Sequence, residues 1–247
     1  MRSANAKRCA TIASSLLLLS GLCGCVETTQ QKNARARLRA ERVLASQGSV
    51  QVTRRNPNVT VGDVALLHGD SATAIAVMLR NNAATPTSDL PISVGIRTQD
   101  GHAVLLNRKP ELPYFQTHVA AIAGGAQVAW VFSTPTVVAS SARPFAMVGQ
   151  SALPIGVGIK RLPLVTGLVA SARGRPLVNA TLSNRSNVPQ YGLAAYAYAL
   201  SGNRFLAAGY APVADLEPGS TATVAMRLIG DPRGADVHID APPTILQ

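Results

Sequence analysis

The body of this chain contains an internal repeat, and the repeat limits the fold more than any other feature of the sequence. The segment Leu79-Arg80-Asn81 recurs 103 residues later as Leu182-Ser183-Asn184, and the Pro and Leu that follow keep the same spacing. Residues 119–125 recur as residues 213–219, at an offset of 94. The shorter offset places a deletion of nine residues in the second copy, in a stretch where loops tolerate changes in length. The chain must therefore build one structural unit twice.

Both copies have the pattern of short β-strands. Ile75, Val77 and Leu79 alternate with small or polar residues, and residues 128–132 form a continuous apolar run. Predicted turns lie at Asp100-Gly101, Ser201-Gly202 and Pro218-Gly219. The strands predicted in the second copy cover residues 177–182, 193–200, 204–208, 222–228 and 237–240. Six or seven strands in about 95 residues are typical of a small β-sandwich, so we expect an all-β protein with two tandem immunoglobulin-like β-sandwiches.

The two predicted sandwiches occupy residues 50–150 and 151–247, and they resemble immunoglobulin-like modules, including the FxLYD type, that recur in bacterial envelope lipoproteins. The shared features are an apolar strand ending in Asn81 or Asn184, a strand leading to Asp100-Gly101 or Ser201-Gly202, and an apolar-x-x-Gly turn at Gly125 or Gly219. The resemblance implies a binding or spacing function and carries no catalytic residues.

Residues 1–24 have the three parts of a lipoprotein signal peptide. Basic residues precede an uncharged run of 14 residues from Cys9 to Leu22, which is too short to span a membrane as a helix. The run closes with Leu22-Cys23-Gly24-Cys25, which resembles the lipobox of bacterial lipoproteins and implies lipidation of Cys25. Ordinary signal cleavage is the alternative. Because Cys9, Cys23 and Cys25 are the only cysteines, the mature chain would keep one thiol, at its first position.

Residues 25–49 form a polar, basic tether. Its composition favours a helix capped by Thr28 or Thr29, although its apolar residues do not form a continuous stripe. The candidate contacts with an anionic membrane surface or wall polymer are Lys32, Arg35, Arg37, Arg39 and Arg42. A simple solvated arm is the alternative interpretation. If lipid is the contact, neutralising the four arginines should release a non-acylated protein from anionic vesicles.

The net charge of +11 is unevenly distributed along the chain. The signal peptide contributes +3, residues 25–55 contribute +5, and the remaining 192 residues contribute only +3. Aromatic residues make up only 4% of the chain. A nearly neutral body with few aromatic residues argues against a nucleic-acid-binding protein.

The sequence lacks the nucleophile-elbow motif of hydrolases and a complete nucleotide-binding motif. The string Gly-x-Ser-x-Gly does not occur, and the GxGxxG pattern that begins at Gly156 has Arg161 in place of its last glycine. We therefore expect no enzymatic activity and no cofactor. The one weak metal candidate is the alternating set Asp236, His238 and Asp240, which would share one face of a strand. The alternative is the solvent face of an edge strand.

The repeat also sets the register of the strand at residues 193–200. Ile92, Val94 and Ile96 should point into the first sandwich and leave Arg97 outside, so alanines at 195, 197 and 199 should point into the second. The outward residues are then Tyr196, Tyr198 and Leu200. An apolar patch with polar tips is typical of a protein-binding surface. The alternatives are a different register in the second copy, or packing of the two sandwiches on each other through this face.

These features predict a non-enzymatic binding or structural module of the cell envelope. We expect it to be held by lipid on the outer leaflet of the cell membrane, or on the outer membrane where two membranes are present. The expected partners are an envelope protein or an anionic wall polymer. The alternative function is that of a metal-carrying or small-ligand-binding lipoprotein.

Overall fold

The computed structural model describes residues 28–45, 52–151, 161–171 and 176–246. The predicted signal peptide and Cys25 lie outside these residues. The helices are α1 (Thr29–Ala45) and the short 3-10 helix η1 (Tyr114–Gln116). The strands are β1 (Val59–His68), β2 (Thr73–Asn81), β3 (Thr87–Arg97), β4 (Ala103–Leu105), β5 (His118–Ile122), β6 (Gln127–Thr134), β7 (Arg143–Val148), β8 (Val165–Ser171), β9 (Leu177–Asn184), β10 (Gln190–Ser201), β11 (Arg204–Leu216), β12 (Thr221–Arg227), β13 (Ile229–Gly230) and β14 (Asp236–Asp240).

Strands β1–β7 form the first sandwich. One sheet has the order β1-β2-β6, and in the other β3 pairs with β4 and β5 along one edge and with β7 along the other. Val77 on β2, Val94 on β3 and Trp130 on β6 are fully buried in the core. The alternation of apolar and polar residues along these strands therefore directs one face of each sheet inward, as the sequence predicts.

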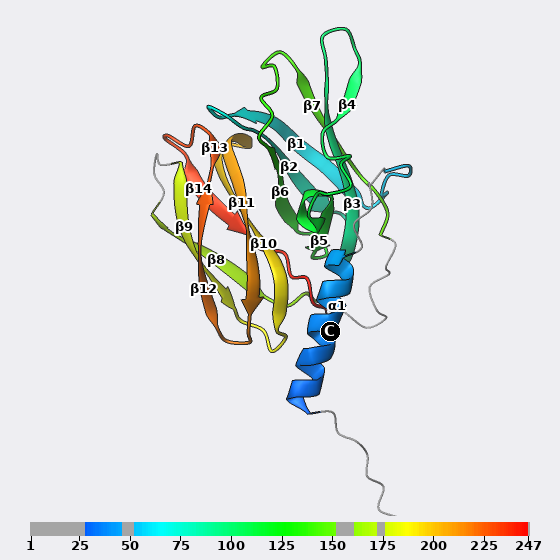
Figure 1. Ribbon diagram of the computed structural model, residues 1–247, viewed down its shortest axis with the longest axis vertical. Helices are drawn as coiled ribbons and strands as arrows, with labels where there is room; N and C mark the ends of the chain where they lie inside the picture. Colours follow the sequence, from blue (N-terminus) through cyan, green and yellow to red (C-terminus); the bar gives the residue numbers. More distant parts are fainter. Residues whose placement is uncertain (1–27, 46–51, 152–160, 172–175, 247) are drawn as a thin grey trace, which may run out of the picture.

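Strands β8–β14 form the second sandwich, with sheets β12-β9-β8 and β13-β11-β10-β14. Ala195, Ala197 and Ala199 on β10 lie fully buried in its core. The register predicted from the repeat is therefore confirmed for β10. The protein is all-β apart from its helices, and both units are immunoglobulin-like sandwiches, as predicted (Figure 1).

The repeat reproduces a buried hydrogen-bond motif. Asn81 at the end of β2 and Asn184 at the end of β9 are buried. The Nδ2 atom of each donates to the carbonyl oxygen four residues later, at 2.9 Å to Thr85 and at 2.8 Å to Val188. Each Nδ2 atom also donates to the last carbonyl oxygen of the facing sheet's strand, at 3.2 Å on β5 and 3.0 Å on β11. Each asparagine therefore ties the two sheets of its sandwich together.

The nine extra residues of the first unit lie within residues 106–117, between β4 and β5. In the second unit the corresponding segment is one continuous strand, β11. Asn107 anchors this inserted segment, because its Nδ2 atom donates to the Gln116 carbonyl oxygen at 3.0 Å. Gln116 in turn bonds the free edge of β6, donating to Val131 at 3.2 Å and accepting from the Ser133 N–H at 3.0 Å. The inserted segment thus covers a strand edge that would otherwise be open.

Asp89 has a left-handed backbone, with φ of 51°, where its equivalent in the second unit is Gly192 with φ of 58°. Aspartate tolerates this conformation better than most residues. Its carboxylate accepts a 2.8 Å hydrogen bond from the Tyr114 hydroxyl, and the Tyr114 ring stacks on His118 with centroids 4.8 Å apart. Through its hydrogen bond with Tyr114, the side chain of Asp89 secures η1 against β3.

Burial lowers the pKa of His118, the partner of the Tyr114 ring.

The tether is helical, and α1 begins with a capping box. The Thr28 Oγ1 atom accepts from the Gln31 N–H at 3.3 Å, and the Gln31 Oε1 atom accepts from the Thr28 N–H at 3.0 Å. One side of α1 packs on the body of the protein (Figure 1). The buried cluster at this contact comprises Ala36, Val188, Tyr191 and Ile245. The tether therefore lies against the second sandwich over part of its length.

We expect Ala36→Asp to detach α1 from the second sandwich and to leave the sandwiches folded. Ala36 is 6% exposed, so the new carboxylate would be desolvated against apolar side chains. Hydrogen exchange should become faster throughout α1, while the exchange in β2, inside the first sandwich, stays unchanged. Ala34→Asp is the matched control, because Ala34 is exposed on the same helix. Equal protection of α1 in the two variants would contradict the docking.

Candidate functional site

The face of β10 that the sequence predicts as a binding patch lies between the two sandwiches. Tyr196 and Tyr198 point out of their own sandwich, as predicted, but they are only 2% and 8% exposed. Leu200 is half-buried beside them and packs against the core of the first sandwich. The prediction of an exposed partner-binding patch at these three residues is therefore wrong. The structure shows the alternative, in which the sandwiches pack on each other through this face (Figure 1).

Small side chains on the first sandwich make this packing possible. Ala74 and Ala76 on β2 and Ala129 on β6 lie on the outer face of their sheet, yet all three are 0% exposed. Alanines on this face leave room for the rings of Tyr196 and Tyr198, which join the same apolar cluster. The middle of the sheet β1-β2-β6 is thus buried on both faces, and the described residues form a stack of four sheets (Figure 1).

Two long hydrogen bonds also cross the contact between the sandwiches. The Tyr196 hydroxyl donates to the Phe115 carbonyl oxygen in the inserted segment at 3.4 Å, and burial raises the pKa of Tyr196. The Phe205 N–H donates to the Asp63 carboxylate on β1 at 3.4 Å. The inserted segment of the first unit therefore contributes directly to the contact with the second.

The metal candidates Asp236, His238 and Asp240 occupy β14, but they serve different contacts. The Asp240 Oδ2 atom accepts a 2.7 Å hydrogen bond from the Ala129 N–H on the edge of β6, and the His238 ring stacks on Tyr198 with centroids 5.5 Å apart. Asp236 is exposed. Within the part of the chain that the structure describes, no three His, Cys, Asp or Glu side chains are grouped to hold a metal ion. Asp240 therefore belongs to the contact between the sandwiches.

The ionisation of Asp240 should oppose folding. Burial raises the pKa of Asp240, and its hydrogen bonds with Ala129 and Tyr198 offset this only in part. Because the folded state holds this proton more tightly than the unfolded state, Asp240 contributes stability at low pH that is lost as the pH rises through its folded pKa. We expect the free energy of unfolding of the wild type to fall relative to Asp240→Asn as the pH rises from below 3.8 to neutrality.

Urea unfolding of both proteins at several pH values measures this difference. Asp236→Asn, which removes an exposed carboxylate from the same strand, is the matched control. A difference between wild type and Asp240→Asn that does not vary with pH would contradict the predicted effect.

The basic residues predicted to contact a membrane or wall polymer have different surroundings in the structure. The Arg37 Nη2 atom lies 2.8 Å from the Asp215 carboxylate on β11, and its guanidinium lies 5.3 Å from the Tyr191 ring centroid. Arg37 is therefore directed to the second sandwich. Lys32 and Arg35 are exposed. The side chains of Arg39 and Arg42 lie outside the described residues.

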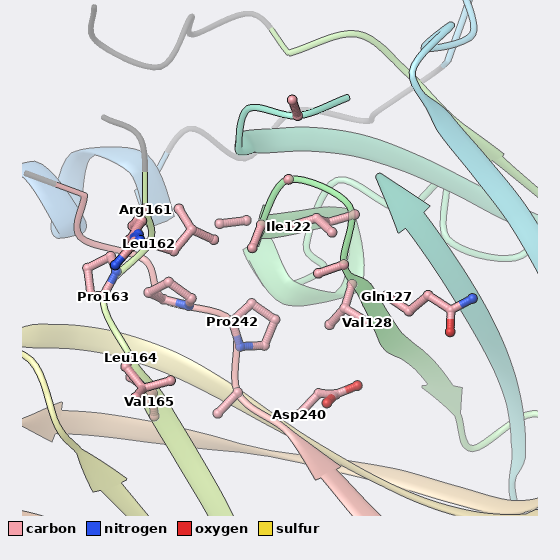
Figure 2. Close-up of a pocket in the computed structure, with 17 residues that line it drawn as sticks. Ile122, Gln127, Val128, Arg161, Leu162, Pro163, Leu164, Val165, Asp240 and Pro242 are labelled. Atoms are coloured by element: carbon pink, nitrogen blue, oxygen red, sulfur yellow. The ribbon is translucent and has the colours of Figure 1, made fainter. Parts of the chain in front are cut away.

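A cavity of about 490 Å³ lies where the two sandwiches and their linker meet. Its walls are the turn between β5 and β6, residues 161–165 and the chain after β14. In Figure 2, Ile122 and Val128 lie on one side, Leu162 and Pro163 on the other, and Pro242 between them. The walls are mainly apolar, and the Asp240 carboxylate at the margin already accepts the Ala129 hydrogen bond. Arg161 and Gln127 also line this hollow, which is open to solvent and can take a small group that is partly apolar and partly polar.

No described helix is both long enough and apolar enough to cross a membrane.

The fold and these contacts define a protein of two immunoglobulin-like sandwiches that pack on each other and hold an N-terminal helix. No model of a known protein family and no curated protein matches the sequence. Among solved structures, the chain is similar to the transglutaminase of red sea bream, with 13% identity and a TM-score of 0.25. The match covers 90% of this chain and 32% of the transglutaminase chain, so this chain spans about a third of that length.

Proposed function

We propose that the protein is an extracytoplasmic lipoprotein that acts as a rigid, non-enzymatic structural module of the cell envelope. Lipid on Cys25 would hold it on the outer leaflet of the cell membrane, or on the outer membrane where there are two. An envelope protein or an anionic wall polymer would be its partner.

The observation that carries this proposal is the burial of Tyr196 and Tyr198 between the sandwiches. A flexible binding protein would keep such side chains available, whereas here they fix one sandwich to the other. Docking of α1 through Ala36 extends the same rigidity towards the N-terminus. Cys25 precedes α1 by four residues, so a lipid there would place the membrane at the outer end of this helix (Figure 1). A rigid body on a short connection suits a spacer.

Lipidation is tested by the incorporation of an alkyne fatty acid into the full chain expressed in bacteria. We expect Cys25→Ala to abolish labelling and to release the protein from the membrane fraction, because a stable anchor requires acyl chains. Cys23→Ala, which alters the neighbouring cysteine, is the matched control and should stay labelled. Equal labelling of Cys25→Ala and wild type would exclude this anchor.

A further inference from the structure

Two arginines face each other on the outer surface of the first sandwich. Arg97 on β3 and Arg143 on β7 are direct partners in the antiparallel register, and both are exposed. Like charges directly opposite each other destabilise a sheet pair. An anion bound between the two guanidinium groups would convert this repulsion into attraction.

Arg97 is held in position by an aromatic ring. Gly95 and Phe145 are the next outward-facing pair along these strands, and a Cβ atom at Gly95 would lie only 2.7 Å from the Phe145 ring. The absence of that atom lets the ring lie across the strand. The Arg97 guanidinium carbon then lies 5.4 Å from the Phe145 ring centroid, a cation–π distance. Such stacking reduces the freedom that Arg97 would lose on binding a ligand.

The two arginines line a cavity of about 440 Å³. The residues around it are Arg97, Thr98, Gln99, Gly101, Ser141 and Arg143, which include hydroxyl and amide donors and no acid. None of the ion pairs within residues 52–151 involves Arg97 or Arg143. The neighbouring Asp100 carboxylate instead lies 3.5 Å from the His102 Nε2 atom. The cavity therefore offers positive charge and hydrogen-bond donors together.

We infer that this cavity is a binding site for a phosphate group, free or carried on a phosphodiester. Guanidinium groups bind phosphate oxygens through paired N–H donors, and the Ser141 hydroxyl and the Gln99 amide are further donors beside them. The Thr98 hydroxyl already donates to the His102 carbonyl oxygen at 3.1 Å. The second unit has Tyr198 and Leu200 at the positions of Gly95 and Arg97, and both pack against the first unit. The site is thus a property of the first unit alone.

The position of the site also bears on its ligand. The β4 and β7 end of the first sandwich, which carries the arginines, lies at the opposite end of the body from the exposed part of α1 (Figure 1). With the N-terminus of α1 directed at a membrane, the cavity would face away from it. This position favours a phosphate from solution or from a polymer over the headgroups of the anchoring membrane.

Calorimetric titration of the purified protein with inorganic phosphate tests the site. Loss of one guanidinium in Arg97→Gln or Arg143→Gln should weaken binding about tenfold or more, the effect of losing a charge-assisted hydrogen bond. Arg227→Gln is the matched control, because it removes an exposed charge from β12 of the second sandwich. Absence of phosphate binding by the wild type, or equal affinity in all variants, would overturn the inference.

Thermal unfolding at low ionic strength gives a second measurement, whose comparison in the absence of phosphate does not depend on ligand affinity. We expect Arg143→Gln to raise the midpoint without phosphate, since it relieves the repulsion with Arg97. Phosphate should raise the midpoint of the wild type and leave unchanged that of a variant that carries both Arg97→Gln and Arg143→Gln. Competition with inorganic phosphate by poly(glycerol phosphate) or by phosphatidylglycerol vesicles identifies the source, and an absence of competition by either assigns free phosphate.

Discussion

Tyr196→Ala should lower the free energy of unfolding by about 4 kcal/mol, the usual cost of truncating a large buried aromatic side chain. Tyr196 is 2% exposed and belongs to the cluster that joins the two sandwiches. Ala74 and Ala76 on the opposing sheet are too small to fill the space that the ring would leave. The cavity should therefore remain or fill with water, and the two sandwiches should lose their fixed orientation.

Urea unfolding measures the loss of stability, and the distance between spin labels at Asn82 and Thr223 measures the orientation. Both positions are exposed and lie in different sandwiches. The wild type should give one narrow distance distribution, and Tyr196→Ala should broaden it. Tyr196→Phe is the matched control, because it removes only a long hydrogen bond of 3.4 Å to Phe115. A narrow distribution in Tyr196→Ala would show that the orientation does not depend on this ring.

The sequence predicts the inside of each sandwich well, because alternation and repetition are local properties of the chain. Because the offset of 103 aligns Val94 with Ala197, the inward orientation of Val94 predicts an inward Ala197, and both residues are fully buried. The same arithmetic correctly sends Tyr196 to the outer face. Whether an outer face meets water or another sheet is decided by contacts with distant residues, which periodicity does not encode. The alanines at positions 74, 76 and 129 are a signal of that contact, since outer faces are usually polar.

The fall in the repeat offset from 103 to 94 also marks a segment that takes part in the contact between the sandwiches. The nine extra residues mark the segment that carries Phe115 and Gln116, which bond Tyr196 and the edge of β6. A length difference locates such an insertion but does not say what it touches. The pairing of Arg97 with Arg143 is also hidden in the sequence, since strands β3 and β7 are distant in the chain and meet only in the folded sheet.

Asn184→Ala should lower the free energy of unfolding by about 3 kcal/mol, because it leaves several buried polar groups without partners. The Nδ2 atom donates to the Val188 and Leu216 carbonyl oxygens at 2.8 and 3.0 Å, and the Oδ1 atom accepts from the Ser186 N–H at 3.0 Å. Asn184 is 1% exposed, so water cannot replace these bonds without opening the sandwich. Asn81→Ala should have an effect of similar size, since Asn81 makes the corresponding bonds in the first unit.

Asn184→Asp keeps the volume of the side chain but replaces its N–H donors with a carboxylate, so it tests the hydrogen bonds separately from packing. At neutral pH the carboxylate oxygen would lie against two carbonyl oxygens with no proton between them. This repulsion should make Asn184→Asp at least as unstable as Asn184→Ala. As the pH falls, protonation supplies one donor, and Asn184→Asp should recover relative to Asn184→Ala in urea unfolding. Asn179→Ala on the exposed face of β9 is the matched control and should stay within about 0.5 kcal/mol of wild type. If Asn184→Ala were as stable as Asn179→Ala, the hydrogen bonds of Asn184 would not be what holds the two sheets together.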